Sequence, residues 1–445
     1  MTVPDSRLVC AGCGASVPPE EPFPFRCPRY GTGDADHVLA RQLELTGIEF
    51  PIEGDANPFI RFRELSHSWS FARRLGMSDG AYVGLVRELS DRVAEVDGRS
   101  FEVTPYERSE DLTGELDLGA LWIKDETGNA AGSHKARHLM GIALQIRVAE
   151  RVGLVERDDT PLAVASCGNA ALAAAVIAKA LGRSLRVFVP VDADAAVIER
   201  LGELGARLVR CERTRAPGDP CYRSFLQAVA RGAVPFGCQG NENALAIDGG
   251  QTLGFEILAQ HAASGAGPID RIVIQVGGGA LSSSTIQAMQ TGLALGVIGK
   301  MPWIDVVQTR GSHPLERAFE RLVDRADASS IEDALRHAAR HRSAYMWPWE
   351  TGPGEKGPVS IASGILDDEA YDWLVIVRAL YETGGSVVIA GEEALLQARD
   401  LARSRSGIGV SATGAAGLAG LLELESRGGL NPEESVVVLF TGSER

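Results

Sequence analysis

The stretch that decides the fold runs from Lys124 to Arg137 and reads KDETGNAAGSHKAR. It leaves a short apolar strand, turns through two glycines, and enters a predicted helix for which Ser133 is the expected N-cap. Lys135 then lies in the first helical turn, where the helix dipole, His134 and Arg137 disfavour further positive charge. A lowered pKa would make the Lys135 amine a Schiff-base nucleophile; a solvated helix lysine is the alternative interpretation.

Lysine is scarce in this chain, which narrows the choice of a reactive amine. Of its 44 basic residues, only five are lysine, namely Lys124, Lys135, Lys179, Lys300 and Lys356. We expect Lys124 at a strand end, Lys179 on an Ala-rich helix and the last two in loops. None of these four follows a Gly/Ser-rich turn like the one before Lys135, so Lys135 is the predicted nucleophile.

From about residue 118 onward, apolar strand-like runs alternate with Ala-rich helical stretches. The predicted strands are Leu121–Ile123, Leu162–Ala165, Leu185–Val189, Arg207–Val209, Arg271–Val276, Asp305–Gln308 and Val436–Phe440. The predicted helices are Ala136–Val152, Ala170–Leu181, Ala195–Leu204, Gly250–Ala263 and Ser282–Leu295. Buried strands separated by helices indicate an α/β fold with parallel sheets covered on both faces. In such sheets, ligands bind where strands end and turns lead into helices.

Two further Gly-containing turns follow predicted strands in this way. Ser166–Asn169 (SCGN) offers backbone N–H groups and a hydroxyl, which suit a carboxylate, and the Asn169 amide, which suits a phenolic or carbonyl oxygen. Gly277–Ser282 (GGGALS) lets the backbone wrap an anion in front of a helix N-terminus. It is neither a Walker loop nor a Rossmann GxGxxG. Each turn alone also fits an ordinary helix start, whereas the three turns in this order form a specific signal.

The order of the segments KDETGN-x-x-GSHK, SCGNAA, GGGAL and a final strand ending at Thr441-Gly442 resembles the fold type II pyridoxal-phosphate (PLP) enzymes. Threonine synthase, threonine dehydratase and the tryptophan synthase β chain are the members with which it compares best. The segment SATGAAGL at Ser411–Leu418 is similar to threonine synthases. The resemblance spans about residues 100 to 445 and implies two open parallel-sheet subdomains with PLP as the cofactor.

The resemblance also implies a role for each matching residue. Lys135 corresponds to the lysine that binds PLP, and His134 resembles the His-Lys pair of the tryptophan synthase β chain rather than the phenylalanine common in dehydratases. The expected cofactor contacts are Lys135, His134, Asn169, Gly277, Gly278, Gly279, Ala280, Leu281, Ser282 and Thr441, with Thr441 facing the pyridine nitrogen. The expected contacts to the substrate carboxylate are Ser166, Cys167, Gly168 and Asn169.

The N-terminal cysteines suggest a small zinc-ribbon-like module. Threonine-synthase-like proteins often carry one, although position 30, where a fourth cysteine is expected, is a tyrosine. The candidate ligands are Cys10, Cys13, Cys27 and His37, with Asp34 or Asp36 as alternatives to His37. We expect any bound zinc to be structural, because nothing in the sequence links these residues to the PLP motifs.

The expected domain organisation has three parts. Residues 1–40 form the cysteine module, and residues 41–110 form an extension that packs on the catalytic part. Residues 111–445 form the PLP-binding region, with a smaller subdomain at about 150–240. The seven cysteines are not spaced as a disulfide framework, which fits an intracellular chain.

Composition excludes some classes of partner. The formal net charge of −15 argues against a nucleic-acid partner, because such binding depends on clustered Lys and Arg. No apolar run approaches the ~20 residues of a membrane span, and no secretory signal is visible. We therefore expect a cytoplasmic protein that binds a small amino acid, and the resemblance implies a homodimer.

The resemblance implies a PLP-dependent lyase or synthase. It would catalyse β-elimination or β-replacement on a small L-amino acid (serine, threonine or an O-activated derivative) through a Lys135 Schiff base and an aminoacrylate-type intermediate. Two alternatives stay open. One is threonine synthase, which combines γ-elimination with β-addition on O-phospho-L-homoserine. The other is a non-catalytic regulator that binds PLP or an amino acid, although a regulator has no need of a nucleophilic lysine.

Overall fold

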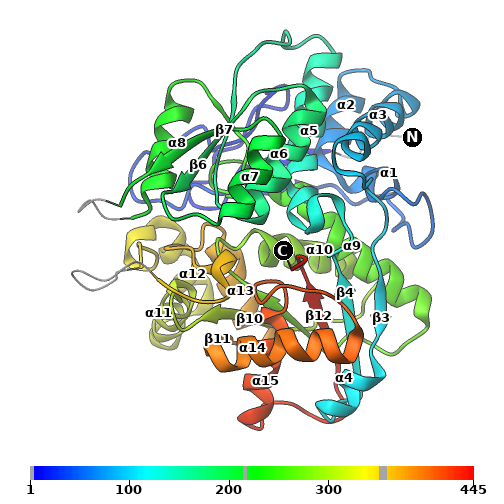
Figure 1. Ribbon diagram of the computed structural model, residues 1–445, viewed down its shortest axis with the longest axis vertical. Coiled ribbons are helices and arrows are strands. Elements are labelled where there is room, and N and C mark those ends of the chain that lie inside the picture. The colour runs from blue at the N-terminus through cyan, green and yellow to red at the C-terminus, as the bar shows by residue number, and fades with distance from the viewer. Residues whose placement is uncertain (1–4, 214–217, 350–357, 445) are drawn as a thin grey trace. The chain divides into compact units, whose positions relative to one another are not determined.

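A computed structural model of the chain describes residues 5–213, 218–349 and 358–444. These residues divide into two compact units, each with its own parallel sheet (Figure 1). The first unit comprises residues up to 32, 37–103 and 129–252, and the second comprises 33–36, 104–128 and 253–445. Lys356, the last of the five lysines, lies outside the described residues.

The first unit is built on a four-stranded parallel sheet in the order β7-β6-β5-β8. Its strands are β5 (Leu162–Ala165), β6 (Leu185–Pro190), β7 (Arg207–Cys211) and β8 (Val234–Pro235). The helices between and beside them are α5 (Lys135–Arg151), α6 (Asn169–Leu181), α7 (Ala195–Glu203) and α8 (Pro220–Ala230). Every residue of β5 is buried, as expected for a central strand that α6 and α8 contact.

The N-terminal part of the first unit adds a small antiparallel sheet and three helices. The sheet pairs β1 (Ser6–Cys10) with β2 (Leu39–Leu43). The helices are α1 (Pro58–Arg61), α2 (His67–Arg74) and α3 (Asp79–Asp97). α2 packs against α5, and α3 packs against α6, so this layer covers the helices that follow the first two turns of the predicted site.

The second unit is built on a six-stranded sheet in the order β11-β10-β9-β12-β4-β3, which is parallel except for β3 at its edge. Its strands are β3 (Tyr106–Arg108), β4 (Ala120–Asp125), β9 (Arg271–Gln275), β10 (Trp303–Thr309), β11 (Val387–Ala390) and β12 (Ser435–Phe440). Its helices are α4 (Glu110–Glu115), α10 (Ala280–Ala294), α11 (Pro314–Ala328), α12 (Ile331–Arg340), α13 (Trp373–Thr383), α14 (Glu392–Leu401) and α15 (Ala416–Ser426). The division between the units falls within α9 (Leu245–Ser264).

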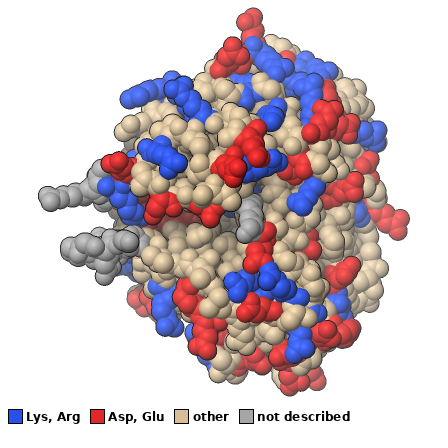
Figure 2. Space-filling model, viewed as in Figure 1, with Lys and Arg blue, Asp and Glu red and all other residues tan. Residues whose placement is uncertain are grey.

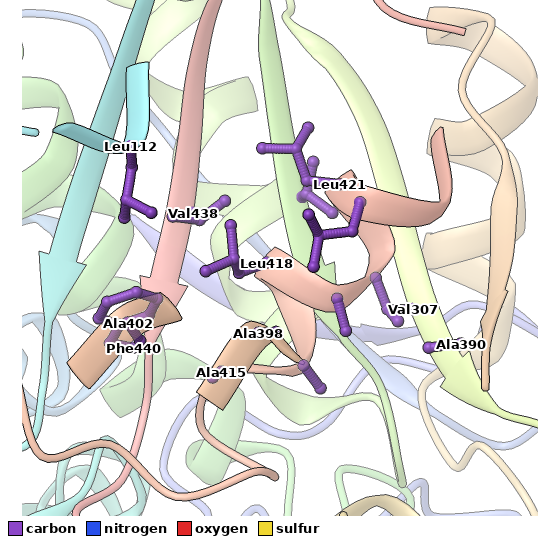
Figure 3. Close-up of a cluster of buried hydrophobic side chains, with 14 of the residues drawn as sticks. Leu112, Val307, Ala390, Ala398, Ala402, Ala415, Leu418, Leu421, Val438 and Phe440 are labelled. Carbon is purple, nitrogen blue, oxygen red and sulfur yellow. The ribbon is translucent and has the colours of Figure 1, made fainter. Parts of the chain in front are cut away.

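A buried apolar cluster holds α15 on the sheet of the second unit (Figure 3). Leu418 and Leu421 of α15 share this cluster with Val438 and Phe440 of β12 and with Val307 of β10. Burial of one leucine side chain contributes about 1.5–3 kcal/mol to stability. The cluster therefore fixes the strands whose carboxyl ends carry predicted site residues.

The predicted α/β fold with parallel sheets is confirmed. Each predicted strand is present within two residues of its expected bounds, and each predicted helix is present, although α9 starts at Leu245 rather than Gly250. The expected helix cap at Ser133 is wrong. The helix α5 begins at Lys135, and the backbone of His134 before it is already helical (φ −55°, ψ −22°), while Ser133 is extended and its buried hydroxyl forms no hydrogen bond with the described residues.

The charged surface has no strong bias on the face shown in Figure 2. Acidic and basic side chains are interspersed there. Among the described residues, no helix has the length and apolar character needed to cross a membrane.

Candidate active site

Lys135 is the first residue of α5 and is half-buried. The chain reaches it through the short 3-10 turn Ala130–Gly132, in which Ala131 has a φ of +56°. Residues other than glycine rarely adopt this conformation. The carboxylate of Asp97, the last residue of α3, accepts a hydrogen bond from Ala131 N at 2.8 Å. This strained and anchored turn fixes where the chain enters α5 and therefore where Lys135 lies.

The other described lysines are all engaged. Their partners are Glu256 Oε2 for Lys124 (2.5 Å), Glu203 O for Lys179 (3.3 Å) and Asp270 Oδ1 for Lys300 (3.2 Å). Lys124 is also fully buried. Lys135, by contrast, has no hydrogen bond or ion pair with any part of the chain that the structure describes. Its amine is thus the one among these four that is available for a ligand.

A neutral histidine lies beside Lys135. One turn further along α5, His138 is buried, and its Nδ1 donates to Ala246 O at 2.7 Å. Burial, and then the charge of Lys135, lower the pKa of His138 to about 3. The His134 ring packs edge-on against it, with 5.6 Å between ring centroids. Because His138 is neutral near pH 7, it adds no positive charge next to the amine.

The turn Ser166–Asn169 follows β5 and leads into α6 in the first unit. Asn169 is the first residue of α6, and Gly168 at the N-cap offers no side chain to the free amides of the first turn. Cys167 is exposed. The turn Ala130–Gly132 contacts α6, so the first unit brings the entrance to Lys135 beside the helix that Asn169 begins.

The turn Gly277–Gly279 links β9 to α10 in the second unit. Gly279 is the N-cap of α10 and has a φ of +95°, a conformation that glycine adopts without strain. No side chain caps this helix, so the amides of Ala280, Leu281 and Ser282 have no partners within it. Such amides, at the positive end of a helix dipole, bind phosphate oxygens well.

The segment Asp367–Asp372 packs directly against this turn. Tyr371 N donates to Gly278 O at 2.8 Å. A Cβ atom on Gly277 would collide with the carboxylate of Asp367, and one on Gly278 would collide with the ring of Tyr371. Close packing therefore leaves little room for a side chain at either glycine.

Thr441 follows β12, the parallel neighbour of β9, and is buried. Thr441 N donates to Gly414 O at 3.2 Å. Gln275, the last residue of β9, donates from Nε2 to Thr441 Oγ1 at 2.8 Å. The second unit therefore brings Thr441 and the strand that precedes Gly277 together at one edge of its sheet.

The four predicted metal ligands meet in the first unit. The ligand atoms of Cys10, Cys13, Cys27 and His37 all lie within 4.8 Å of one another. Pairing of Cys10 with Leu39 across β1 and β2 brings the residues before β2 close to Cys10. The separations are 3.6 Å from Cys10 Sγ to His37 Nδ1 and 3.5 Å between the sulfurs of Cys13 and Cys27. Three sulfurs and one imidazole nitrogen form a typical structural zinc set.

Local hydrogen bonds prepare this Cys/His cluster for a metal. His37 Nε2 donates to Thr32 O at 2.8 Å, so the proton is on Nε2 and the Nδ1 lone pair faces the sulfurs. Burial raises the pKa of the Cys10 thiol to about 12 and also raises that of Cys27. For Cys13, burial is outweighed by a hydrogen bond from Ala15 N and by contacts with the neighbouring thiols, which lower the pKa to about 7. The alternative ligands Asp34 and Asp36 instead bind Ser343 and Arg342 in the second unit.

Comparison with known proteins identifies the chain at the level of family. Residues 99–442 match the family described as "Pyridoxal-phosphate dependent enzyme". The chain belongs to this family. The matched range contains Lys135, the turns after β5 and β9, and Thr441, and it leaves the Cys/His cluster outside. The fold is that of the fold type II PLP enzymes, as the resemblance implied.

Two curated relatives are threonine synthases. The protein from Methanosarcina acetivorans is 25% identical over 347 residues, and that from Methanocaldococcus jannaschii is 24% identical over 345 residues. Both alignments cover 76% of this chain and 74% of the relative. Among solved structures, a threonine deaminase from T.th. superposes with a TM-score of 0.57 at 23% identity, covering 81% of this chain and 98% of that one. This likeness shows the shared fold.

The residues present suit PLP. The buried hydroxyls of Ser133, Ser282 and Thr285 find no hydrogen-bond partner within the described ranges. Ser133 lies two residues before Lys135, and the other two lie on the first turns of α10. Unpartnered buried hydroxyls cost free energy unless a ligand satisfies them. Within the second unit, the hydroxyls of Ser282 and Thr285 and the amides behind Gly279 offer donors of the kind that a phosphate-bearing cofactor requires.

Two features of the site were not predicted from the sequence. One is Gln275. Its position at the end of a predicted strand, just before the glycines, could have marked it as a residue near the site. The other is the segment Asp367–Asp372, which is about 90 residues from the turn it packs against. Both depend on tertiary packing.

Proposed function

We propose that this chain is a PLP-dependent enzyme that catalyses elimination or replacement at Cβ of a small L-amino acid, such as serine, threonine or an O-activated derivative. The observation that carries the proposal is the available amine of Lys135 at the start of α5. Membership of the PLP-dependent family supplies the cofactor. The predicted set of cofactor contacts includes a nucleophilic lysine, which favours an enzyme over a regulator.

Lys135 has two tasks in this proposal. Its amine would hold PLP through the cofactor's aldehyde and, once free of that link, would accept the proton from Cα of the substrate. PLP, when bound, supplies the electron sink that makes this proton acidic. The neutral imidazole of His138 keeps further positive charge away from the reacting amine.

The other predicted residues would bind and orient the cofactor and the substrate. The amide of Asn169 would hold the phenolic oxygen of the cofactor, and the amides of Gly277–Gly279 and of the start of α10 would hold its phosphate. The turn Ser166–Asn169 holds the substrate carboxylate with its backbone N–H groups. A neutral hydroxyl at Thr441 does not keep the pyridine nitrogen protonated as a carboxylate would, which favours elimination or replacement over transamination.

The threonine synthase reaction is the second candidate. It is supported by the two threonine synthases that align with three quarters of this chain. It requires a cationic site for the phosphate of O-phospho-L-homoserine. Release of inorganic phosphate from that compound, with threonine as product, would favour it, whereas formation of a 2-oxo acid and ammonia from serine or threonine would favour the first candidate.

Lys135→Ala tests the proposal directly. We expect wild-type protein with PLP to show a visible absorption band that changes with one amino acid, and borohydride to fix the cofactor on Lys135. Lys135→Ala should lose the fixed cofactor and lower kcat by about a thousandfold or more, because it removes both the covalent link and the base. Lys179→Ala is the matched control, because the Lys179 amine donates to the backbone carbonyl of Glu203 at the end of α7.

The outcomes separate three interpretations. A retained band in Lys135→Ala would move the covalent link to another lysine. PLP bound without turnover across a panel of amino acids would favour the regulator. Absence of PLP binding by the wild-type protein would reject the proposal.

We further propose that the Cys/His cluster binds a structural zinc. Cys10→Ser should lower the zinc content measured by metal analysis and lower Tm, because zinc binding contributes free energy to folding. The KM for the amino acid should stay within about twofold, since the cluster takes no part in the chemistry. Cys167→Ser is the control and should retain zinc. Wild-type protein purified without a chelator and free of zinc would contradict this proposal.

A further inference from the structure

The side chain of Gln275 sits in a pocket of hydrogen-bond acceptors at the end of β9. Its Nε2 lies 2.7 Å from Gly414 O, 2.8 Å from Thr441 Oγ1 and 3.2 Å from Leu439 O. Gln275 is only 3% exposed and Thr441 only 1%. Water therefore has little access to this network, and the protein groups determine its geometry.

The orientation of the Gln275 amide follows from these neighbours. Carbonyl oxygens accept hydrogen bonds and cannot donate, so the –NH2 end of the amide must face Gly414 O and Leu439 O. An –NH2 group has two hydrogens, and the two shortest contacts are those to Gly414 O and Thr441 Oγ1. Thr441 Oγ1 is thus an acceptor from Gln275, and its own proton points away from Gln275.

The other end of the amide indicates why glutamine occupies this position. Gln275 Oε1 is buried, has no hydrogen-bond partner among the described residues, and faces Gly417 of α15. An unsatisfied buried carbonyl lowers stability, and a methionine of similar size would avoid that cost. A residue retained only for packing does not require this amide, whereas the two N–H donors account for it.

We propose that Gln275 is a positioning residue that fixes the Thr441 hydroxyl as a hydrogen-bond donor toward the pyridine nitrogen of PLP. This rests on the proposed function, in which Thr441 faces that nitrogen. Two constraints on Thr441 are separate. Its backbone is held by the bond from Thr441 N to Gly414 O, and its hydroxyl proton is directed by Gln275. A neutral hydroxyl held in this way would donate a hydrogen bond to the nitrogen without protonating it.

The test uses PLP labelled with 15N at the pyridine nitrogen, bound to the full-length protein. Its 15N resonance reports the hydrogen bond to that nitrogen independently of turnover. We compare wild type, Gln275→Met, Thr441→Val and the double variant. Loss of the donor in Thr441→Val should move the resonance toward that of a nitrogen without a hydrogen bond. Gln275→Met should move it in the same direction, because the freed hydroxyl turns toward Gly414 O.

Three controls sharpen the test. The double variant should shift the resonance no further than Thr441→Val, since Gln275 acts through that hydroxyl. Thr441→Ser keeps a hydroxyl, so its 15N resonance should lie near the wild-type position. Gln275→Glu keeps the shape of the side chain should Gln275→Met fold poorly. It loses both N–H donors, retains at most one O–H donor when protonated, and should also shift the resonance. PLP affinity should fall by about three- to tenfold in each Gln275 variant.

The outcomes distinguish the role of Gln275 from the proposed contact of Thr441 with PLP, on which that role rests. If Thr441→Val moves the resonance and both Gln275 variants leave it at the wild-type position, the role of Gln275 is rejected and the position of Thr441 is retained. If Thr441→Val itself leaves the resonance unchanged, or if wild-type protein binds no PLP, the proposed contact of Thr441 is rejected, and the role of Gln275 with it.

Discussion

Two turns of this molecule have the same topology but are held very differently. Ser166–Asn169 and Gly277–Gly279 each connect a parallel strand to a helix that has no side-chain cap. In the first turn Cys167 is exposed, and a Cβ atom on Gly168 would meet nothing within 4 Å. In the second, the segment Asp367–Asp372 packs against each glycine. One turn is open and the other is closed by tertiary contacts.

The difference matches what each turn is proposed to bind. A cofactor that stays bound benefits from amides that are already in place, because no conformational freedom is lost on binding. A substrate that enters and leaves in every cycle is better served by a turn that its own binding can order. We therefore expect rigidity at the phosphate and adaptability at the substrate carboxylate.

The largest expected effect comes from adding one methyl group to the closed turn. Gly279→Ala places a Cβ atom at 3.0 Å from Ile376 Cδ1 and forces alanine into a φ of +95°. Such backbone strain costs about 1–3 kcal/mol, before the displaced amides weaken phosphate binding. We expect the Kd for PLP, measured by absorbance titration, to rise about a hundredfold or more.

Gly168→Ala is the matched change in the open turn. It meets no atom within 4 Å and its φ of −138° is accessible to alanine. The Kd for PLP should change by less than about threefold. Equal effects of the two variants on PLP affinity would remove the contrast between a rigid and an adaptable turn.

An effect of intermediate size is expected on the stability of the protein at acidic pH. His67 and His138 are both buried in the first unit, and burial, helped by nearby positive charge, lowers the pKa of each to about 3. Their unfolded pKa is about 6.5. Between pH 6.5 and 3 the unfolded chain binds protons that the folded chain does not, so stability decreases as pH falls through this window. From pH 7 to pH 5, each histidine should remove about 2 kcal/mol.

Urea denaturation at the two pH values measures this loss. His67→Gln should lose less stability between pH 7 and pH 5 than wild type does, because one of the two titrating groups is absent. His341→Gln, at an exposed position on the surface, should retain the full wild-type loss. An unchanged acid sensitivity in His67→Gln would show that other groups titrate in this range.

The same contrast explains how much the sequence could predict. Runs such as Leu162–Ala165 predict their strands because nearly continuous apolar character is required where helices contact a parallel strand. Lys135 could be selected because lysine is scarce and its turn has a distinctive composition. His37 could be proposed only as one of three ligands, since the strand register that brings it to Cys10 is a property of the folded chain. Likewise, no local pattern links Asp367 to Gly277, although their packing makes the closed turn rigid.

The smallest expected effect is a change in the rate at which Cys167 in the open turn is chemically labelled. Exposed Cys167 should react with iodoacetamide at least about tenfold faster than buried Cys211 or Cys221, since burial raises the pKa of the Cys221 thiol. Mass spectrometry of tryptic peptides gives each rate. An amino acid substrate should slow labelling of Cys167 about threefold if its carboxylate binds in this turn. Gly279→Ala, which disturbs only the closed turn, should leave the substrate-free rate unchanged. Labelling of Cys167 that stays constant with saturating substrate would place the carboxylate elsewhere, and the open turn would then need another explanation.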